Sequence, residues 1–303
     1  MPNILLLGAT GMIGKALTVA LSKEGYIFTA ACRDVKKAAE VLPPTTRIIP
    51  MHFNSALFEQ GLVEANAVIN ITGSPILGRF TSKHRHQVEE SRIALTKNLV
   101  TAIERHHPTL PLLINASAIG IYGSHTITDD VLDEYSTIVP EDYLSDLCQR
   151  WEAAASGGIK RIVRIRTGIV LDSSSQGTLS KLAVSFRLGF GGPIGIPKTW
   201  RSWIHLQDEI GLIRFALEHD SMSGPLNATA PEPVQADALA KALSVALHKP
   251  TWLAVPEGPV RLILGEAAEI ITRGKRILPT KAIAAGYHFE FSTLESALHD
   301  LLR

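Results

Sequence analysis

The stretch Gly8-Ala9-Thr10-Gly11-Met12-Ile13-Gly14 decides the fold, because its glycines follow the pattern GxxGxxG between two apolar segments. The run Ile4-Leu5-Leu6-Leu7 before it is typical of a buried parallel strand. The segment Lys15-Ala16-Leu17-Thr18-Val19-Ala20-Leu21 after it has the apolar spacing of a helix packed on a sheet. Strand, glycine turn and helix together predict a site for the pyrophosphate of a nucleotide. The residues expected to contact that cofactor in the turn are Gly8, Thr10, Gly11, Met12, Ile13 and Gly14.

Composition limits the class of protein. With 303 residues, 46% hydrophobic and 19% charged, the chain is expected to be globular, with one domain or two. A net charge of +1 gives no global attraction to nucleic acid or to an anionic membrane, so neither is expected as a partner. Two cysteines, Cys32 and Cys148, make no disulfide framework and favour the reducing cytoplasm. We identify no targeting segment and no membrane span.

The end of the second predicted strand, residues 27–32, carries the residues that distinguish two dinucleotides. NAD-binding proteins commonly place an acidic side chain there for the ribose 2′-hydroxyl, whereas an arginine accommodates the 2′-phosphate of NADP. Arg33 and Asp34 stand at this place, with Lys36 and Lys37 close behind. Arg33 can clamp a phosphate, so we predict NADP(H) rather than NAD(H). One alternative is that Asp34 contacts a ribose hydroxyl, as in NAD-binding proteins. The other is that these residues form a solvated turn of mixed charge without a ligand.

The remaining N-terminal part alternates strands with helices. The pattern predicts strands at residues 47–51, 67–71, 112–115 and 161–166, helices at residues 36–41, 87–105 and 143–155, and a loop at residues 78–83. Such alternation implies an α/β fold with a doubly wound parallel sheet, whose ligands bind at the carboxyl ends of the strands. The residues expected to contact the cofactor at these ends are Thr72, Gly73, Ser74, Ala116, Ser117, Arg166, Thr167 and Gly168.

Beyond Gly168 the pattern changes. The run Leu188-Gly189-Phe190-Gly191-Gly192-Pro193-Ile194-Gly195 is too rich in glycine for regular structure and indicates a loop, either a lid over a cleft or a connector. We therefore predict a nucleotide-binding domain at residues 1–170, with residues 203–230 packing back on it. Residues 171–303 would supply the glycine-rich loop and a smaller, mainly helical lobe that closes the substrate side.

Several motifs resemble a known family. The stretch Gly8–Gly14, the run Ser117-Ala118-Ile119-Gly120-Ile121-Tyr122-Gly123 and the run Arg166-Thr167-Gly168-Ile169-Val170-Leu171 resemble an extended short-chain dehydrogenase/reductase. Residues 186–195, Ser202-Trp203-Ile204-His205 and the tail from residue 231 to residue 298 resemble an atypical branch described as NAD(P)-dependent epimerase/dehydratase-like. Some members carry the label "cell division inhibitor". The resemblance spans nearly the whole chain and implies a Rossmann domain, bound NADP(H) and a characteristic C-terminal domain without an assigned role.

The resemblance also exposes a missing pair. The parent family uses a tyrosine as acid and base, together with a lysine four residues later that lowers the tyrosine pKa and holds the ribose. A glutamate commonly follows that lysine by four residues, and Glu152 as this anchor puts Cys148 at the lysine position and Leu144 at the tyrosine position. No shift restores the pair, because the chain has no lysine between Lys97 and Lys160.

Other residues of the usual set are replaced as well. Ala118 stands at the expected serine position, and Arg92 stands where a helical asparagine is expected. The candidates for a substitute acid or base are Ser117, Tyr122, Tyr143 and Cys148. The candidates for substrate binding are Arg92, Trp203 and His205. Each also has a structural interpretation: packing for Tyr122 and Cys148, a surface ion pair for Arg92, a loop contact for His205, and a cofactor contact without chemistry for Ser117.

Two interpretations follow. In the first, the chain is an NADP(H)-dependent oxidoreductase or epimerase that acts on a small hydroxyl- or carbonyl-bearing compound. In the second, it binds NADP(H) without turnover and serves as a sensor or scaffold. The histidines in Lys83-His84-Arg85-His86 and His106-His107 lack accompanying acidic or cysteine ligands, so no metal site is predicted. The expected partner is a small molecule, with a homodimer as a further possibility.

Overall fold

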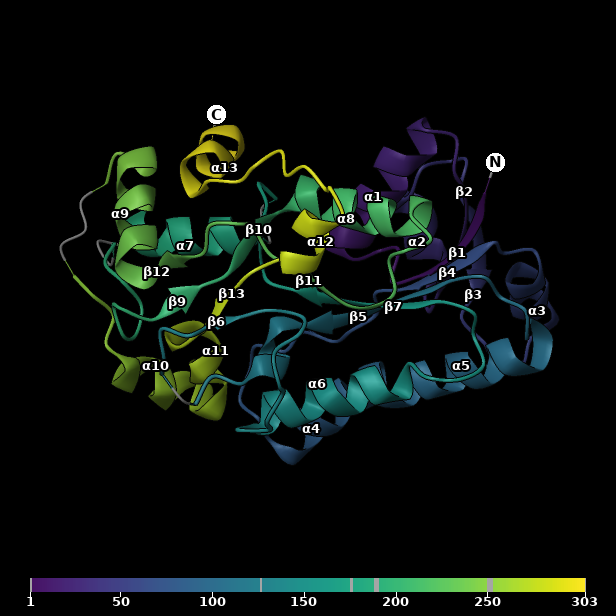
Figure 1. Ribbon diagram of the computed structural model, residues 1–303, viewed down its shortest axis with the longest axis horizontal. Helices are drawn as coiled ribbons and strands as arrows, with labels where there is room; N and C mark the ends of the chain where they lie inside the picture. Colours follow the sequence, from purple (N-terminus) through teal and green to yellow (C-terminus); the bar gives the residue numbers. More distant parts are fainter. Residues whose placement is uncertain (1, 126, 175–176, 188–190, 250–252, 303) are drawn as a thin grey trace.

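The computed structural model describes residues 2–125, 127–174, 177–187, 191–249 and 253–302. Within these ranges, seven parallel strands form one sheet in the order β3-β2-β1-β4-β5-β7-β11 (Figure 1). Their bounds are Asn3–Leu7 (β1), Ile27–Cys32 (β2), Arg47–Pro50 (β3), Ala67–Asn70 (β4), Leu113–Ala118 (β5), Ile162–Thr167 (β7) and Gly224–Ala228 (β11). The strand order reverses between β1 and β4, and this switch point is where open α/β sheets bind ligands. The predicted Rossmann-like fold is confirmed.

Helices cover both faces of the sheet (Figure 1). Helices α1 (Met12–Lys23), α2 (Val35–Val41) and α8 (Leu206–Glu218) share one core with the sheet, and α3 (Ala56–Val63) and α5 (Leu95–His106) share the other. Strand β1 contributes to both, because successive side chains of a strand point to opposite faces: Ile4 and Leu6 enter the first core, Leu5 and Leu7 the second. A strand buried on both faces reads as a continuous apolar run, as residues 4–7 do.

The long helix predicted at residues 87–105 begins earlier and is interrupted. Helix α4 (Ser82–Glu89) starts where the Thr81 side chain accepts a hydrogen bond from the His84 backbone N–H, so the predicted loop is shorter than expected. A π-helical segment, Glu90–Ala94, then joins α4 to α5. Such segments often occur at functional sites. Helix α6 (Tyr143–Ala154) lies beside α5 and packs on β5, close to its predicted range.

Residues 203–230 contribute to the main domain in two ways. Helix α8 packs against α1, and β11 pairs with β7 at the edge of the sheet. The sequence analysis missed β11, which contains Pro225, a residue with no backbone N–H to donate. An edge strand tolerates proline, since one of its sides needs no partner.

The C-terminal region is mainly helical and lies beside the sheet, toward the left of Figure 1. Its helices are α7 (Thr178–Arg187), α9 (Ala236–Leu247), α10 (Glu257–Leu264), α11 (Glu269–Thr272), α12 (Thr280–Ala284) and α13 (Leu294–Leu301). Short strands accompany them: β6 (Val131–Leu132), β8 (Ile169–Leu171), β9 (Trp200–Arg201), β10 (Trp203–His205), β12 (Val234–Gln235) and β13 (Arg276–Ile277). Single-turn 3-10 helices cover Ile119–Tyr122 and Gly265–Ala268.

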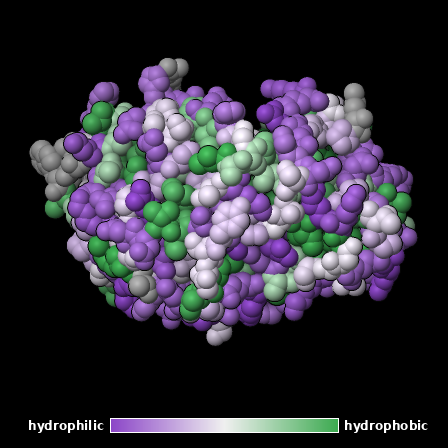
Figure 2. Space-filling view, viewed as in Figure 1, coloured by the Kyte–Doolittle hydropathy of each residue, from purple (hydrophilic) through white to green (hydrophobic). Residues whose placement is uncertain are grey.

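Part of the predicted glycine-rich loop, residues 188–190, lies outside the described residues. Its described part is held by backbone hydrogen bonds from Gly192 to Leu253 and from Gly195 to Val255. Figure 2 shows a face covered mostly by hydrophilic residues, with apolar residues in small groups. Within the described residues, no helix is long and apolar enough to cross a membrane.

Candidate functional site

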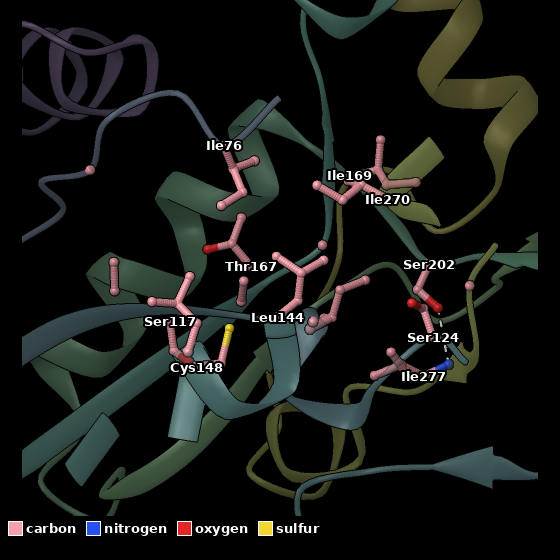
Figure 3. Close-up of a pocket in the computed structure, with 18 of the residues that line it drawn as sticks. Ile76, Ser117, Ser124, Leu144, Cys148, Thr167, Ile169, Ser202, Ile270 and Ile277 are labelled. Carbon is pink, nitrogen blue, oxygen red and sulfur yellow. Dashed lines mark hydrogen bonds between the residues drawn. The ribbon is translucent and has the colours of Figure 1, made fainter. Parts of the chain in front are cut away.

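A cavity of about 420 Å³ lies at the carboxyl edge of the sheet. Its inner wall is formed by the residues that follow β4 (Thr72 and Gly73) and by the ends of β5 (Ser117) and β7 (Thr167). Residues of the C-terminal region form its outer wall. Figure 3 shows Ser117 and Cys148 toward one end and Ser124, Ser202 and Ile277 toward the other. The cavity therefore joins the predicted cofactor-binding strand ends to the C-terminal region.

The glycine turn adjoins this cavity through Ile13, which lines it. Gly8 has φ +93°, and a Cβ there would lie 2.7 Å from the Ile71 carbonyl oxygen. A Cβ on Gly14 would lie 2.3 Å from the Gly8 carbonyl oxygen, so neither position accepts a side chain. Helix α1 has no side-chain cap at Gly11 and no acidic residue in its first turn, which leaves the N–H groups of that turn for an anion. The turn fits a pyrophosphate group.

The two residues after β2 have different surroundings. The Asp34 carboxylate accepts a hydrogen bond of 3.0 Å from the Lys37 backbone N–H and caps helix α2. Arg33 is exposed beside it. Asp34 therefore has a structural task, and Arg33 is the residue at this strand end that remains open to a ligand.

Ser117 belongs to a buried polar network on the α6 side of the sheet. Its hydroxyl donates to Glu152 Oε1 at 2.7 Å. Arg166, the neighbour of Ser117 in the β5–β7 register, forms a two-pronged ion pair with the same carboxylate, at 2.8 Å from Nε to Oε1 and 3.0 Å from Nη2 to Oε2. This geometry neutralises the Glu152 charge and fixes the Ser117 hydroxyl.

Tyr122 belongs to the same network but not to the cavity lining. Its hydroxyl accepts a hydrogen bond from Arg166 Nη1 at 2.9 Å and lies 2.8 Å from Asn227 Oδ1 and 2.9 Å from the Asp133 carbonyl oxygen. Burial raises the Tyr122 pKa to about 12. With its hydrogen-bonding capacity filled, the hydroxyl links β7 to β11 and to the segment before α6.

Helix α6 presents an apolar side to the cavity. Leu144, Leu147, Cys148 and Trp151 recur at helical spacing and all line it. Cys148 is buried, and burial raises its pKa to about 12, so it is a neutral thiol at physiological pH. Leu144 and Cys148, the residues assigned by the Glu152 anchor to the tyrosine and lysine positions, thus face the cavity without an ionised group.

Among the described residues, Arg92 is the cavity-lining cation that is not paired with a carboxylate. It projects from the π-helical segment, with its guanidinium carbon 5.2 Å from the ring centroid of Trp151. A Cβ on Gly73 would lie only 3.0 Å from Arg92 Nη2, so the guanidinium rests against the turn after β4. Its one hydrogen bond within the described chain is a long one, 3.4 Å to Ser91 Oγ, and none of the ion pairs found there includes Arg92. Burial lowers its pKa, although an arginine stays protonated in proteins.

The other cations at the cavity have acidic partners. Lys275 Nζ lies 2.9 Å from Glu141 Oε1. Arg273 Nη2 lies 3.2 Å from Glu257 Oε1, and Arg273 Nη1 lies 3.7 Å from Glu269 Oε1. These pairs neutralise the outer wall, so the uncompensated positive charge is at the Arg92 end.

Glu209 was missed by the sequence analysis. It lies in the first turn of α8, lines the cavity and is 1% exposed. Thr167 Oγ1 donates to Glu209 Oε1 at 2.8 Å, whereas Oε2 is buried without a hydrogen-bond partner among the described residues. Burial raises the Glu209 pKa to about 8. An acidic residue in a first helical turn is common, so no local pattern distinguishes Glu209 from an ordinary one.

Two predicted substrate-binding residues lie elsewhere. Trp203 is 1% exposed, packs in the core of the C-terminal helices and donates from Nε1 to the Glu232 carbonyl oxygen. His205 is 2% exposed, stacks on Phe291 and accepts the Gln207 backbone N–H at Nδ1, which caps α8. The structure does not bring either side chain to the cavity, because both are used where α8 meets the C-terminal helices.

The other predicted site residues divide between the cavity wall and its surroundings. Those that line the cavity are Ile13, Thr72, Gly73, Arg92, Ala116, Ser117, Cys148, Thr167 and Gly168. Those outside its lining, besides Trp203 and His205, are Gly8, Thr10, Gly11, Met12, Gly14, Arg33, Ser74, Tyr122 and Arg166. Over the part of the chain that the structure describes, no group of three or more His, Cys, Asp or Glu is arranged to hold a metal ion.

Comparison with known proteins identifies the family. A sequence model of the NAD dependent epimerase/dehydratase family matches residues 4–143. The epimerase family protein YfhF of Bacillus subtilis is 34% identical over 99% of this chain and 98% of the relative. The chain belongs to the epimerase/dehydratase family. The mouse epimerase family protein SDR39U1 is also 34% identical, over 99% of each chain.

The C-terminal region and the whole fold of this family member have matches too. Residues 255–301 match a domain of unknown function, DUF1731, so the predicted resemblance is confirmed in both parts. The crystal structure of human epimerase family protein SDR39U1 (isoform 2) with NADPH is 27% identical, with a TM-score of 0.85 over 99% of each chain. MoeE5 in complex with UDP-glucuronic acid and NAD, at 18% identity and a TM-score of 0.78, shares the fold.

Proposed function

We propose that this epimerase-family protein binds NADP(H) and carries out an oxidoreductase or epimerase reaction on a small hydroxyl- or carbonyl-bearing compound. The observation that supports this most is the cavity, which adjoins the glycine turn at Ile13 and is bordered by the C-terminal region. A nicotinamide cofactor supplies or accepts a hydride when bound. A concave, mostly apolar cavity with a few polar groups is the usual form of a small-molecule site.

The choice of NADP(H) over NAD(H) rests on Arg33. Its exposed guanidinium follows β2, where a 2′-phosphate would lie, and Asp34 is engaged as the cap of α2. The human relative was crystallised with NADPH, which agrees with this preference. The backbone of Gly8–Gly14 would hold the pyrophosphate, while Thr72, Gly73, Ser117 and Thr167 would border the nicotinamide half.

Arg92 gives the substrate a chemical class. A half-buried guanidinium without a carboxylate is partly desolvated at a cost in free energy, and an anionic ligand offsets that cost. The surrounding wall of Leu144, Leu147 and Trp151 is apolar, which strengthens an ion pair formed there. We therefore propose a substrate that carries a carboxylate or phosphate beside the reacting hydroxyl or carbonyl group.

The candidate acid and base groups differ in their access to such a substrate. Of the candidates named from the sequence, Ser117 is the one that lines the cavity with a hydroxyl group, and Glu152 orients that hydroxyl. Cys148 lines it as a neutral thiol, which suits contact better than proton transfer at neutral pH. The Tyr122 hydroxyl is outside the lining and engaged on all sides, so we assign Tyr122 a structural role.

A second function, NADP(H) binding without turnover, is favoured by one observation. Leu144 and Cys148 face the cavity at the positions assigned to the family's tyrosine and lysine, so the usual acid–base pair is replaced by neutral groups. A protein with this cavity wall would keep the cofactor and respond to a ligand as a sensor or scaffold.

The experiment that separates the two functions uses purified protein with NADPH and two aldehydes, 4-carboxybenzaldehyde and benzaldehyde, followed by the loss of nicotinamide absorbance. We expect oxidation of NADPH with 4-carboxybenzaldehyde in preference to benzaldehyde, and loss of that preference in Arg92→Met. Arg47→Met, which changes an exposed arginine paired with Glu64, is the matched control. Tight NADPH binding without oxidation by these aldehydes, by ketones, by quinones or by sugar nucleotides would favour the sensor.

The compartment and assembly remain proposals. We propose a cytoplasmic protein on the basis of two cysteines that are both buried and free. One relative, from Arabidopsis thaliana, is named as chloroplastic, so location within the family is not uniform. We propose a homodimer as the assembly to test by analytical ultracentrifugation.

A further inference from the structure

Three hydroxyl groups that line the cavity donate to carboxyl groups. Ser124 donates to Asp142, which also accepts the Ser124 and Ser145 backbone N–H groups as the cap of α6. The other two pairs lie at the strand ends. Ser117 donates to Glu152, and Thr167 donates to Glu209. Arg166 and Thr167 are consecutive in β7, so their side chains point to opposite faces of the sheet, toward α6 and α8 respectively. The two pairs therefore lie on opposite faces of the sheet.

The pairs differ in charge. Glu152 is bound by both prongs of the Arg166 guanidinium. Over the described chain, Glu209 pairs with no cation: its side chain accepts one hydrogen bond, from the Thr167 hydroxyl, and its Oε2 atom has no hydrogen-bond partner. A buried carboxyl group without a cation is stable as the neutral acid, which carries a proton that it can release.

We propose that Thr167 and Glu209 are the proton-donating pair of the cavity. Thr167 is the group that contacts the substrate, and Glu209 is the positioning residue behind it that holds the proton. The proposal rests on the proposed function, since it needs a carbonyl substrate in this cavity. In the view of Figure 3, Thr167 is drawn between Ile76 and Ser117, both of which also line the cavity.

The transfer is balanced as follows. A reduced nicotinamide, when bound, would be the reductant and would supply a hydride to the carbonyl carbon, with the electron pair of the carbonyl π bond moving to the oxygen. That oxygen takes the proton of the Thr167 hydroxyl while Thr167 takes the proton of Glu209, leaving an alcohol and an ionised Glu209. The 2.8 Å separation of Thr167 Oγ1 and Glu209 Oε1 serves a hydrogen bond in either direction. Glu209 then takes up one proton from bulk solvent, so the reduction consumes one hydride and one proton overall.

The charged groups on the elements that pack around α8 are either exposed or bonded to partners other than Glu209. On β7, Arg164 bonds to carbonyl groups of residues 152 and 155, and Arg166 bonds to Glu152, on the α6 side. On α1, Lys15 and Lys23 are exposed. On β10, His205 stacks on Phe291.

The neighbouring acid on α8 is occupied as well. Asp208 accepts the backbone N–H groups of Glu290 and Phe291, and Tyr287 Oη lies 3.2 Å from its Oδ1. None of these groups neutralises a Glu209 carboxylate, which agrees with desolvation as the main cause of its raised pKa.

The first test needs no turnover. Infrared difference spectra of the full-length protein with NADPH, recorded across pH, report the C=O stretch of protonated carboxyl groups. We expect a band at neutral pH that is absent in Glu209→Gln and disappears from wild type as the pH rises through about 8. Glu134→Gln is the matched control, because Glu134 is also a buried glutamate but binds the Asn227 and Lys281 backbone N–H groups outside the cavity. A wild-type spectrum that Glu209→Gln leaves unchanged overturns the proposal.

The second test follows NADPH-dependent reduction of 4-carboxybenzaldehyde across pH. General acid catalysis contributes about 10²–10⁴-fold, so we expect Glu209→Gln to lower kcat by about 100-fold or more, with NADPH affinity unchanged. Thr167→Val should lose as much, and the double variant no more than either, whereas Thr167→Ser should recover the rate. The wild-type rate should fall as the pH rises through about 8, and Glu209→Gln should lose this step.

The outcomes separate the two proposals. If wild type and Glu209→Gln reduce the aldehyde at the same rate and with the same pH profile, the Thr167–Glu209 assignment is overturned. The proposed function would still stand in that case. Wild type that binds NADPH but reduces no carbonyl probe overturns the proposed function, and with it the proton transfer. A kcat loss in Glu134→Gln equal to that in Glu209→Gln also overturns the assignment, because it would show a general effect of altering a buried glutamate.

Discussion

Replacing Glu209 by glutamine should make the protein more stable, and the gain should appear only above acidic pH. The Glu209 pKa is raised from 4.5 to about 8 in the folded protein. Between pH 4.5 and about 8, Glu209 therefore keeps its proton in the folded protein, whereas the unfolded chain has released it. For a carboxyl group with a raised pKa, stability is highest below the unfolded value and falls as the pH rises toward the folded value.

The magnitude follows from the two pKa values. One pH unit between them corresponds to about 1.4 kcal/mol, so wild type should lose about 5 kcal/mol of unfolding free energy from this group between pH 4 and pH 9. Glutamine has the shape of the neutral acid and can still accept the hydrogen bond from Thr167, but it does not titrate. We therefore expect wild type and Glu209→Gln to be about equally stable at pH 4, with Glu209→Gln more stable by about 3 kcal/mol at pH 7.

The assay is urea denaturation of both proteins at several pH values, followed by tryptophan fluorescence. Only the difference between the two proteins is used, because the other titrating groups are common to both. Glu295→Gln, which changes an exposed carboxylate of α13, is the control and should show no such divergence. A gap between wild type and Glu209→Gln that stays constant across pH would falsify the assignment of a buried neutral acid.

Three further predictions concern the cofactor, a cysteine and a tyrosine. Arg33→Ala should weaken NADPH binding about 10- to 100-fold, because a charge-assisted hydrogen bond to the 2′-phosphate is lost, and should have little effect on NADH binding. Fluorescence titrations measure both affinities, and equal affinity of wild type for NADPH and NADH would contradict the proposed NADP(H) preference. Cys148, with its pKa raised to about 12, should resist iodoacetamide at neutral pH until the protein unfolds, and rapid alkylation detected by mass spectrometry would show a reactive thiolate instead. Tyr122→Phe should cost about 1–3 kcal/mol in urea denaturation, because Asn227 and Arg166 lose a buried partner, while turnover persists. Unchanged stability with lost turnover would make Tyr122 part of the chemistry.

The sequence predicted the fold well because local patterns encode it. Residues 4–7 form a strand buried on both faces, and the glycines at 8 and 14 are required by backbone atoms 2.7 Å and 2.3 Å from where a Cβ would be. Strand β11 was not predicted because a segment that contains a proline has a weak strand pattern of its own, and it is its pairing with β7 that makes it a strand. The π-helical segment that carries Arg92 likewise gave no pattern of its own.

The candidate site was only partly readable. Trp203 and His205 are polar or aromatic residues in a family motif, but the structure uses them where α8 meets the C-terminal helices, away from the cavity. Glu209 is the opposite case, because it was not predicted and yet lines the cavity. In the sequence it is an ordinary acidic residue of a first helical turn, and only the packing of α8 on the sheet buries it beside Thr167. Burial and the absence of a neighbouring cation are properties of the three-dimensional surroundings, which no local pattern specifies.

The sequence by itself determined the strand–turn–helix at the N-terminus, the alternation that builds a parallel sheet and the lack of a lysine between Lys97 and Lys160. Each of these depends on residue type and spacing along the chain. Tertiary structure decided which charges are compensated: Glu152 lies against Arg166, Arg92 lies against Trp151 without a carboxylate, and Glu209 lies in the apolar interior. These differences arise because electrostatic free energies depend on distance and solvation, and both are set only when distant segments pack together.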